Sequence, residues 1–378
     1  MTDEHDCAPV WLTGTGDRTR SDDRTKRRDS TERRDSTERT RLGELAEAAS
    51  SVDGDAGRAL ALARRLGASV AGPGDGNTRR LFETLATLAA ADLTAARVAE
   101  AHLDALSILD QAGVDPAGLP GAPTGGGTWG VFAAEAREVR LTARPADGAG
   151  GRWLIDGTKP WCSLAGSLSH ALVTAHTSET TRRLFAVDLA HPGVVVHEGA
   201  WVARGLPAVP SGPVDFRDLP AVPVGDDEWY LRRPGFAWGG IGVAACWWGG
   251  AVGVARRVFA AAREREPDQI ALAHLGALDV LLSAAGGSLA AAATAIDAGT
   301  AAGVDGAILA ARVRGLVART VDEVIARTGH ALGPAPLALD ARHAQRVADL
   351  QLYVRQHHAE RDDASLGRML LTNAPAPW

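Results

Sequence analysis

The spacing of hydrophobic residues changes twice along the chain and divides it into a helical, a strand-rich and a second helical stretch. Between residues 42 and 112, leucine and valine recur at intervals typical of helices with one buried face. From residue 152 to 224, short apolar runs are separated by Gly, Pro and Asp, as in strands joined by turns. After Gly235 the helical spacing returns, with breaks expected at residues 267–268, 297–303 and 329–336. This order predicts an α+β protein with a β-domain between two helical domains.

The changes in pattern also set the expected domain boundaries. We expect a disordered tail (1–41), an N-terminal helical domain (42–115), a β-sandwich or barrel domain (116–232) and a C-terminal helical bundle (233–378). The strands expected in the β-domain are residues 152–155, 171–176, 183–189, 193–198, 213–216 and 221–224.

The tail is predicted to be disordered because it offers almost no apolar side chains for a core. Residues 17–41 contain the hexamer RRDSTE twice in succession, at 27–32 and 33–38. Such a stretch cannot repay the entropy of becoming ordered. Its alternating charges could instead support a helix surrounded by solvent.

Composition narrows the class of protein. The net charge of −6 argues against a nucleic-acid surface. Three cysteines, Cys7, Cys162 and Cys246, lie far apart and form no disulfide framework or CxxC motif, which fits a reducing cytoplasm. The acidic N-terminus has no apolar signal segment, so we expect a cytoplasmic location. Residues 234–255 carry no charge but include seven glycines, which favours a closely packed buried helix or helix pair over a membrane span.

The stretch IDGTKPWCS, residues 155–163, is the first candidate for chemistry. A turn at Asp156–Gly157 is followed by a lysine and then by Trp161, Cys162 and Ser163. A tryptophan at the end of a strand is often ordinary core packing. Cys162 points the other way on a strand and is expected to be inert.

Several stretches, in this order, resemble the acyl-CoA dehydrogenase family of FAD enzymes. AADLTAARVAEAHLDALSIL resembles the long helix before that family's β-domain, and IDGTKPWCS is similar to its G-x-K-x-W-I-T/S segment. RLFAVDLAHPGVVV and PVDFRDLPAVPVG resemble later strands of the β-domain. The resemblance covers roughly residues 79–370 and implies the order helical domain, β-domain and helical domain.

The resemblance implies a set of cofactor contacts. Trp161 would lie beside the FAD ring, and Ser163 would offer its hydroxyl and backbone N–H near N5 of the flavin. Gly329 and Gly333, in RTGHALGPAPL, would form a turn that contacts the adenine and pyrophosphate across a homodimer or homotetramer. A plain helix–helix loop is the alternative for these glycines. Arg263 stands where the family's R-x-x-F-G begins, but the Phe and Gly are missing.

The chain departs from the family where substrate chemistry is concerned. FAAEAREVRLTARP replaces the T-E-P-x-A-G-S-D signature, so that Glu135 stands for the Glu and Ala134 for the Thr. Arg355 stands where the catalytic Glu is expected, and an arginine cannot act as a base at neutral pH. The second position that the family uses falls in FAWGGIGVAACWW, which contains no acid.

The expected source of proton chemistry is therefore the segment QHHAERDD. We rank His358 first, His357 second and Glu360 third, because one continuous helix would carry His358 on the side of Arg355. An ordinary solvated helix face is the alternative. No set of His, Asp and Glu residues has the spacing of a metal site.

The resulting hypothesis is α,β-dehydrogenation of an acyl-CoA or related acyl thioester by an FAD enzyme. It implies a small-molecule acyl substrate and an electron acceptor or flavin reductase as partners. Two alternatives remain: a flavin-dependent monooxygenase on the same fold, which needs no Glu base, and a catalytically inactive scaffold.

Overall fold

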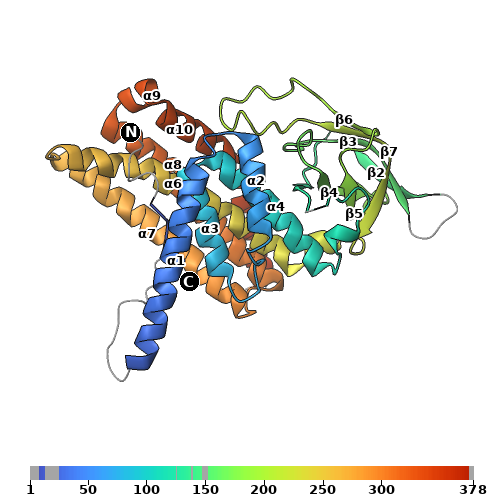
Figure 1. Cartoon of the computed structure of the whole chain (residues 1–378), viewed down its shortest axis with the longest axis horizontal. Coiled ribbons are helices and arrows are strands. Elements are labelled where there is room, and N and C mark those ends of the chain that lie inside the picture. The colour runs from blue at the N-terminus through green and yellow to red at the C-terminus, as the bar shows by residue number, and fades with distance from the viewer. Residues whose placement is uncertain (1–7, 13–24, 125, 138, 147–151, 374–378) are drawn as a thin grey trace.

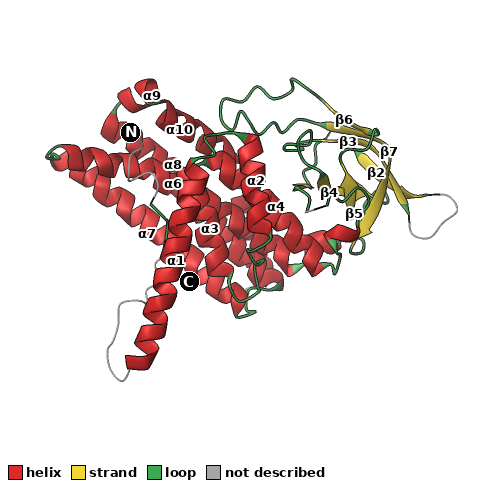
Figure 2. Ribbon diagram, viewed as in Figure 1, coloured by secondary structure: helices red, strands yellow, loops and turns green. Residues whose placement is uncertain are grey.

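A computed structural model describes residues 8–12, 25–124, 126–137, 139–146 and 152–373 (Figure 1). A large group of helices occupies one side of the molecule, and the strands gather at the other end of its long axis (Figure 2). The chain order is helices, strands and helices, as the hydrophobic spacing predicts. The mixed α+β class is thereby confirmed.

The first helices surround a core rich in leucine and alanine. They are α1 (Thr25–Ser50), α2 (Ala56–Gly67), α3 (Thr78–Ala91) and α4 (Leu93–Gln111). Asp55 and Asp92 start α2 and α4 by accepting hydrogen bonds from backbone N–H groups of the first turn. Nearly every residue of α3 is buried, because this helix packs between α1, α4 and the long helix α6 (Pro234–Glu264).

The prediction of a disordered tail is wrong for the part of residues 1–41 that the structure describes. Residues 8–12 lie against α3, where Val10 and Leu12 are buried and their N–H groups donate to Thr87 and Glu83. Residues 25–41 form the first part of α1, and Glu38 pairs with Arg41 one turn later. Residues 1–7 and 13–24 lie outside the described residues.

The strands form a small closed barrel with two additional strands. They are β1 (Trp129–Phe132), β2 (Leu141–Pro145), β3 (Trp153–Lys159), β4 (His170–His176), β5 (Arg182–Asp188), β6 (Val194–Val196) and β7 (Val214–Val224). Strands β4, β2, β3, β7 and β5 pair in that order, and β5 closes the ring on β4. β1 pairs with β4 in parallel, and β6 pairs with β7. A core that includes Ile155, Phe185 and Phe216 fills the barrel.

The sequence pattern missed two strands and divided another. β1 and β2 lie in a Gly- and Pro-rich stretch and are only four and five residues long, too short to show the alternation of apolar and polar residues that marks a strand. β7 joins the two runs predicted at 213–216 and 221–224, because it continues through Pro220 and Pro223 while it pairs with β3 and then β5.

The C-terminal part contains α5 (Trp229–Arg232), α6, α7 (Gln269–Asp297), α8 (Gly303–Leu332), α9 (Ala335–Leu339), α10 (Ala341–Tyr353) and α11 (Glu360–Asn373). Glycines let α6 approach α3 closely, since a Cβ at Gly249 would lie 2.6 Å from the Cα of Ala86. The predicted breaks at 267–268 and 297–303 fall between α6, α7 and α8. The break at 329–336 falls at the end of α8, which continues to Leu332.

The expected continuous helix through QHHAERDD is wrong. α10 ends at Tyr353, a 3-10 turn covers Val354–Gln356, and α11 begins only at Glu360. Ala359 has a left-handed φ of 47° between these helices. His357 and His358 therefore lie in a bend, not on one helical face with Arg355.

Among the helices of the described residues, α6 and α7 are long and apolar enough to cross a membrane by length and composition alone. In α6 the most apolar window is 67% buried among other helices, as expected for the glycine-rich stretch at 234–255. In α7 only 17% of the corresponding window is buried. The apolar outer face of α7 was not apparent from the sequence.

Candidate functional site

The turn that follows β3, residues 160–164 (called the Trp161 turn below), leaves a large aromatic side chain exposed to solvent. Trp161 directly follows β3 and Pro160, has a left-handed φ of 59°, and is 60% exposed. Two backbone hydrogen bonds hold the turn to the segment between β6 and β7: Cys162 N–H donates to Gly212 O at 2.9 Å, and Leu164 N–H to Pro210 O at 2.8 Å. The exposed indole is thus not part of the barrel core.

A buried ion pair fixes the base of this turn. Lys159 is 1% exposed, and its Nζ donates to Glu135 Oε1 at 2.6 Å and to Thr174 Oγ1 at 2.8 Å. Burial acts to raise the pKa of Glu135, but the hydrogen bond and charge of Lys159 outweigh it and lower that pKa. The segment after β1 and the Trp161 turn are therefore tied together. Burial raises the pKa of Cys162 to about 12, so this thiol stays protonated, in line with its expected inertness.

Ser163 links the turn to the N-terminal helices. Its hydroxyl accepts a hydrogen bond from Arg97 Nη2 at 3.1 Å and lies 2.8 Å from the hydroxyl of Ser211. Arg97 projects from α4, and its Nη1 donates to Glu100 Oε2 at 3.1 Å. A small pocket opens here between α4 and β1, with Ser163, Gly130 and Arg97 among its lining residues.

Glu100 is the centre of a buried polar cluster between four helices. Burial raises the pKa of Glu100 to about 7, although the positive charge of Arg97 opposes this shift. The Tyr353 hydroxyl at the end of α10 donates to Glu100 Oε2 at 3.3 Å. Burial raises the pKa of that phenol and of the neighbouring Cys246 thiol on α6, so both remain protonated donors. Glu100 is therefore the group of this cluster whose charge changes near neutral pH.

Trp247 completes the cluster with an unpaired donor. The residue is fully buried, with the guanidinium of Arg314 4.7 Å from its ring centroid. The rings of Tyr353 and His357 meet it edge-on at 6.4 Å and 6.5 Å. Its Nε1–H has no hydrogen-bond partner within the described part of the chain. A buried N–H without a partner costs ~1–3 kcal/mol, so this group is available to a water or a ligand oxygen.

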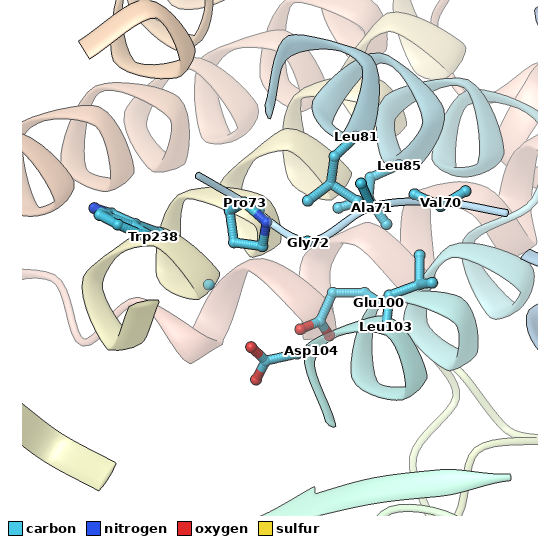
Figure 3. A pocket seen from close by; sticks show the side chains of 12 residues that line it. Val70, Ala71, Gly72, Pro73, Leu81, Leu85, Glu100, Leu103, Asp104 and Trp238 are labelled. Atoms are coloured by element: carbon cyan, nitrogen blue, oxygen red, sulfur yellow. The ribbon is translucent and has the colours of Figure 1, made fainter. Parts of the chain in front are cut away.

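Asp104 lies one helical turn after Glu100. Both acids line another pocket, between α3, α4 and α6 (Figure 3). Burial raises the pKa of Asp104, and the nearby Arg233, with Nη2 3.7 Å from Oδ1, opposes that shift. Gly239 on α6 leaves room for the carboxylate, since a Cβ there would lie 2.8 Å from Oδ1. The remaining wall is largely apolar and comes from the 70–73 segment, Leu81, Leu85, Leu103 and Trp238.

The three residues predicted to supply proton chemistry do not come together. His357 is 8% exposed and contacts Trp247, and burial lowers its pKa. The His358 side chain is 65% exposed, with Nδ1 3.6 Å from Asp362 Oδ1. Glu360 is exposed at the start of α11. Only His357 reaches the buried cluster, because the bend at 357–359 turns the other two outward. Arg355 pairs with Asp322 on the surface.

The residues predicted to contact the adenine side of the cofactor lie far from Trp161. Gly333 ends α8 with a φ of 66°, and a Cβ at Gly329 would meet nothing within 4 Å. The guanidinium of Arg263 lies 5.9 Å from the Phe259 ring. Figure 1 shows α9, which follows Gly333, on the side of the molecule away from the barrel. One chain therefore does not bring these residues to the Trp161 turn.

Sequence reasoning missed the contribution of α4. Arg97, Glu100 and Asp104 are spaced by three and four residues, which places them on one face of a helix. Their neighbours in AARVAEAHLDALSIL are almost all apolar, and charges within such a run are the available signal of a buried polar face. Across the described residues, no group of three or more His, Cys, Asp or Glu side chains could hold a metal ion.

Comparison with known proteins yields similar structures but no related family model. No protein-family model and no curated protein matches the chain. KijD3, solved with FMN and dTDP-3-amino-2,3,6-trideoxy-4-keto-3-methyl-D-glucose, is 21% identical, with a TM-score of 0.72 over 93% of this chain and 95% of that chain.

Two further solved structures are similar over most of their length. TdsC from Paenibacillus sp. A11-2, solved with FMN and indole, is 17% identical with a TM-score of 0.70, covering 89% of this chain and 98% of that chain. A nitrososynthase from Micromonospora carbonacea var. africana is 19% identical with a TM-score of 0.70, covering 88% and 94%. These likenesses show a shared overall fold and support the acyl-CoA dehydrogenase-like architecture expected from the sequence.

Proposed function

We propose that the chain is a flavin-dependent monooxygenase that uses reduced FMN and O2. The observation that carries this proposal is the pairing of an open Trp161 turn with an arginine, Arg355, at the position where the family resemblance places the dehydrogenase base. Arg355 stands at the expected position and pairs with Asp322 on the surface. Dehydrogenation of an acyl thioester needs a carboxylate beside the substrate, whereas oxygen transfer from a flavin does not. TdsC, which shares the fold, is described as a dibenzothiophene monooxygenase.

The residues of the Trp161 turn fit a flavin in three respects. The exposed indole of Trp161 offers a flat surface for stacking, worth ~0.5–1.5 kcal/mol beyond the buried area. The hydroxyls of Ser163 and Ser211 lie beside it and can hydrogen-bond polar atoms at a ring edge. The guanidinium of Arg97, bonded to Ser163, favours negative charge on a reduced ring.

The chain's own residues then orient the reactants and handle protons. When bound, reduced FMN would supply the two electrons that allow one oxygen atom of O2 to enter the substrate and the other to leave as water. Lys159 and Glu135 hold the turn that carries Trp161. The N–H of Trp247 is free to bind an oxygen atom in the buried cluster. The pocket beside Glu100, between α3, α4 and α6, has largely apolar walls.

We propose FMN as the cofactor in place of the FAD expected from the family resemblance. Gly333, a candidate contact to an adenine, ends α8, and α9, which follows it, lies on the side of the molecule away from the barrel (Figure 1). KijD3 and TdsC were both solved with FMN. A second copy of the chain could bring Gly329 and Gly333 to the turn, so comparing FMN with FAD in binding experiments tests this choice.

Dehydrogenation remains the second candidate because Glu100 supplies a carboxylate from an unexpected helix. Glu100 adjoins Tyr353, just before Arg355, and Cys246, within the apolar stretch of α6. It thus lies between the two elements on which the family resemblance places a base. A carboxyl with a pKa of about 7 can accept a proton at neutral pH.

Two assays on the FMN-loaded protein separate these functions. Under anaerobic conditions, short- and long-chain acyl-CoA should leave the absorbance of the oxidised flavin unchanged. With a flavin reductase and NADH in air, the protein should consume O2 and change the ratio of hydrogen peroxide to water when a substrate is present. Bleaching of the flavin by acyl-CoA would favour the dehydrogenase instead.

A further inference from the structure

The acids of α4 form a row that leads from a pocket toward the Trp161 turn. Glu100 and Asp104 lie one turn apart, and Figure 3 shows both carboxylates below the 70–73 segment. The charge of Asp104 acts on Glu100, so the two groups interact. About 30 Å³ of this pocket is open to a water-sized molecule. A water needs ~10–15 Å³ of such space, so about two or three waters fit in the pocket that these acids line.

Hydrogen bonds connect Glu100 to the Trp161 turn. Glu100 Oε2 accepts from Arg97 at 3.1 Å and from the Tyr353 hydroxyl at 3.3 Å. Arg97 reaches Ser163 at 3.1 Å, and Ser163 lies 2.8 Å from Ser211. About 10 Å³ of the second pocket, beside Arg97 and Ser163, is also open to water. Glu100 thus lines the first pocket, and its helix neighbours Arg97 and Ala101 line the second, which reaches the turn at Ser163.

We propose that Glu100 and Asp104 carry protons between solvent and the Trp161 turn. This role rests on the proposed function, because that reaction consumes a proton for each turnover: RH + O2 + FMNH⁻ + H⁺ gives ROH + H2O + FMN. The proton enters from solvent through the waters at Asp104, and Glu100 passes it through the second pocket. Arg97 stays protonated throughout and holds the side chains of Glu100 and Ser163 in place by hydrogen bonds.

The position of Glu100 favours a proton-carrying role over simple pairing with Arg97. Its carboxyl lines the pocket that it shares with Asp104 and also accepts a hydrogen bond from the Tyr353 hydroxyl, while burial raises its pKa to about 7. Half-protonation at neutral pH suits a group that both accepts and donates a proton. The charged and titratable groups that face the two acids are Arg97 on α4, Tyr230 and Arg233 at α5, Cys246 on α6, Arg314 on α8 and Tyr353 at the end of α10.

The first test needs no cofactor. Infrared difference spectra of the apo protein, titrated with acid and base, should contain a carboxylic-acid carbonyl band that disappears with a midpoint near pH 7. The band should be lost in Glu100→Gln and kept in Asp110→Asn, which changes an exposed acid on the same helix. Glu83→Gln, which removes a different buried acid of raised pKa, should also keep it. A band that survives Glu100→Gln overturns the assignment.

The second test follows the proton in the FMN-loaded protein. Oxidation of chemically reduced FMN by O2 follows FMNH⁻ + O2 + H⁺ to give FMN + H2O2, and its rate is measured in H2O and D2O across pH 7. Glu100→Gln should slow this step by about 10²-fold, the lower end for acid–base groups, and alter the solvent isotope effect. Asp104→Asn should slow it less, and Asp110→Asn should match the wild type.

The outcomes separate the proton path from the proposed function. Equal rates, isotope effects and pH profiles in the wild type, Glu100→Gln and Asp104→Asn, all with FMN bound, overturn the path and leave the monooxygenase proposal standing. A wild-type protein that binds no FMN overturns the proposed function, and the infrared titration still decides whether Glu100 holds a proton at neutral pH. Glu100→Asp is the second variant if Glu100→Gln fails to fold, and it should retain part of the rate.

Discussion

Single residues explain why the site lies where it does. Trp161 is exposed because its left-handed backbone and the hydrogen bonds of Cys162 and Leu164 turn the ring away from the barrel. The family resemblance of IDGTKPWCS pointed to this segment, but the predicted turn at Asp156–Gly157 is wrong, because both residues lie within β3 and the chain turns only after Lys159. Glu100 was not identifiable in the same way. Its chemistry depends on burial by α6, α8 and α10, which lie more than a hundred residues away along the chain.

The raised pKa of Glu100 makes a prediction about stability and pH. Because the folded-state pKa of about 7 exceeds the unfolded value near 4.5, the stabilisation is complete below pH 4.5 and is lost as the pH rises toward 7. At ~1.4 kcal/mol per pKa unit, the loss is about 3 kcal/mol. Glu100→Gln should remove this part of the pH dependence, which urea unfolding at several pH values measures. Identical pH dependence in the variant and in the wild type would contradict the burial argument.

At the scale of elements, hydrophobic spacing predicted the long helices. It failed for short strands and for segments whose conformation depends on contacts with distant parts of the chain. Asp268 caps the N-terminus of α7 by accepting a hydrogen bond from the N–H of Ala271. Such a cap can be recognised from neighbouring residues in the sequence. β1 and β2 carry too few residues to show a period. The packing of residues 8–12 on α3 and the bend at 357–359 depend on distant contacts, such as Val10 with Thr87 and His357 with Trp247. No local sequence signal reports contacts of that range.

The close packing of α6 on α3 is the element-scale feature that positions Cys246 and Trp247 beside Glu100. Gly249→Ala should destabilise the fold by ~1–3 kcal/mol, because the added methyl meets the backbone of Ala86. The matched control is Gly367→Ala on α11, where a Cβ meets nothing within 4 Å and helix propensity favours Ala by ~0.5–1 kcal/mol. Chemical denaturation compares both variants with the wild type. If Gly249→Ala were as stable as Gly367→Ala, the close approach of α6 to α3 would be refuted.

At the scale of the molecule, we expect the apolar outer side of α7 to pack against a second copy of the chain. Leu272 and Val280 are 53% and 68% exposed on one side of this helix, and Ile270 is 66% exposed at its start. Pairing of such faces through a twofold axis would bury them, and the homodimer or homotetramer expected from the resemblance would follow. Gly329 and Gly333 would then be available to a partner's cofactor.

Val280→Arg tests this assembly. A charge at the centre of the α7 face should shift the protein toward monomer, measured as molar mass by light scattering after size-exclusion chromatography. Val202→Arg is the control, because Val202 is 89% exposed in the segment between β6 and β7. A wild-type protein that is monomeric at high concentration, or a Val280→Arg variant with unchanged mass, would argue against pairing through α7.

The central claim is that the Trp161 turn binds a flavin, and an equilibrium titration of FMN into the purified protein tests it most directly. FMN fluorescence should change saturably with the wild type, and Trp161→Phe should bind nearly as well because it keeps a ring. Trp161→Ala should bind about tenfold to a hundredfold more weakly, which corresponds to ~1.4–2.8 kcal/mol of lost stacking and burial. Ser167→Ala, an exposed serine four residues beyond Ser163, should bind as the wild type does. Equal FMN affinity in Trp161→Ala and the wild type, or no FMN binding by the wild type, would contradict the account.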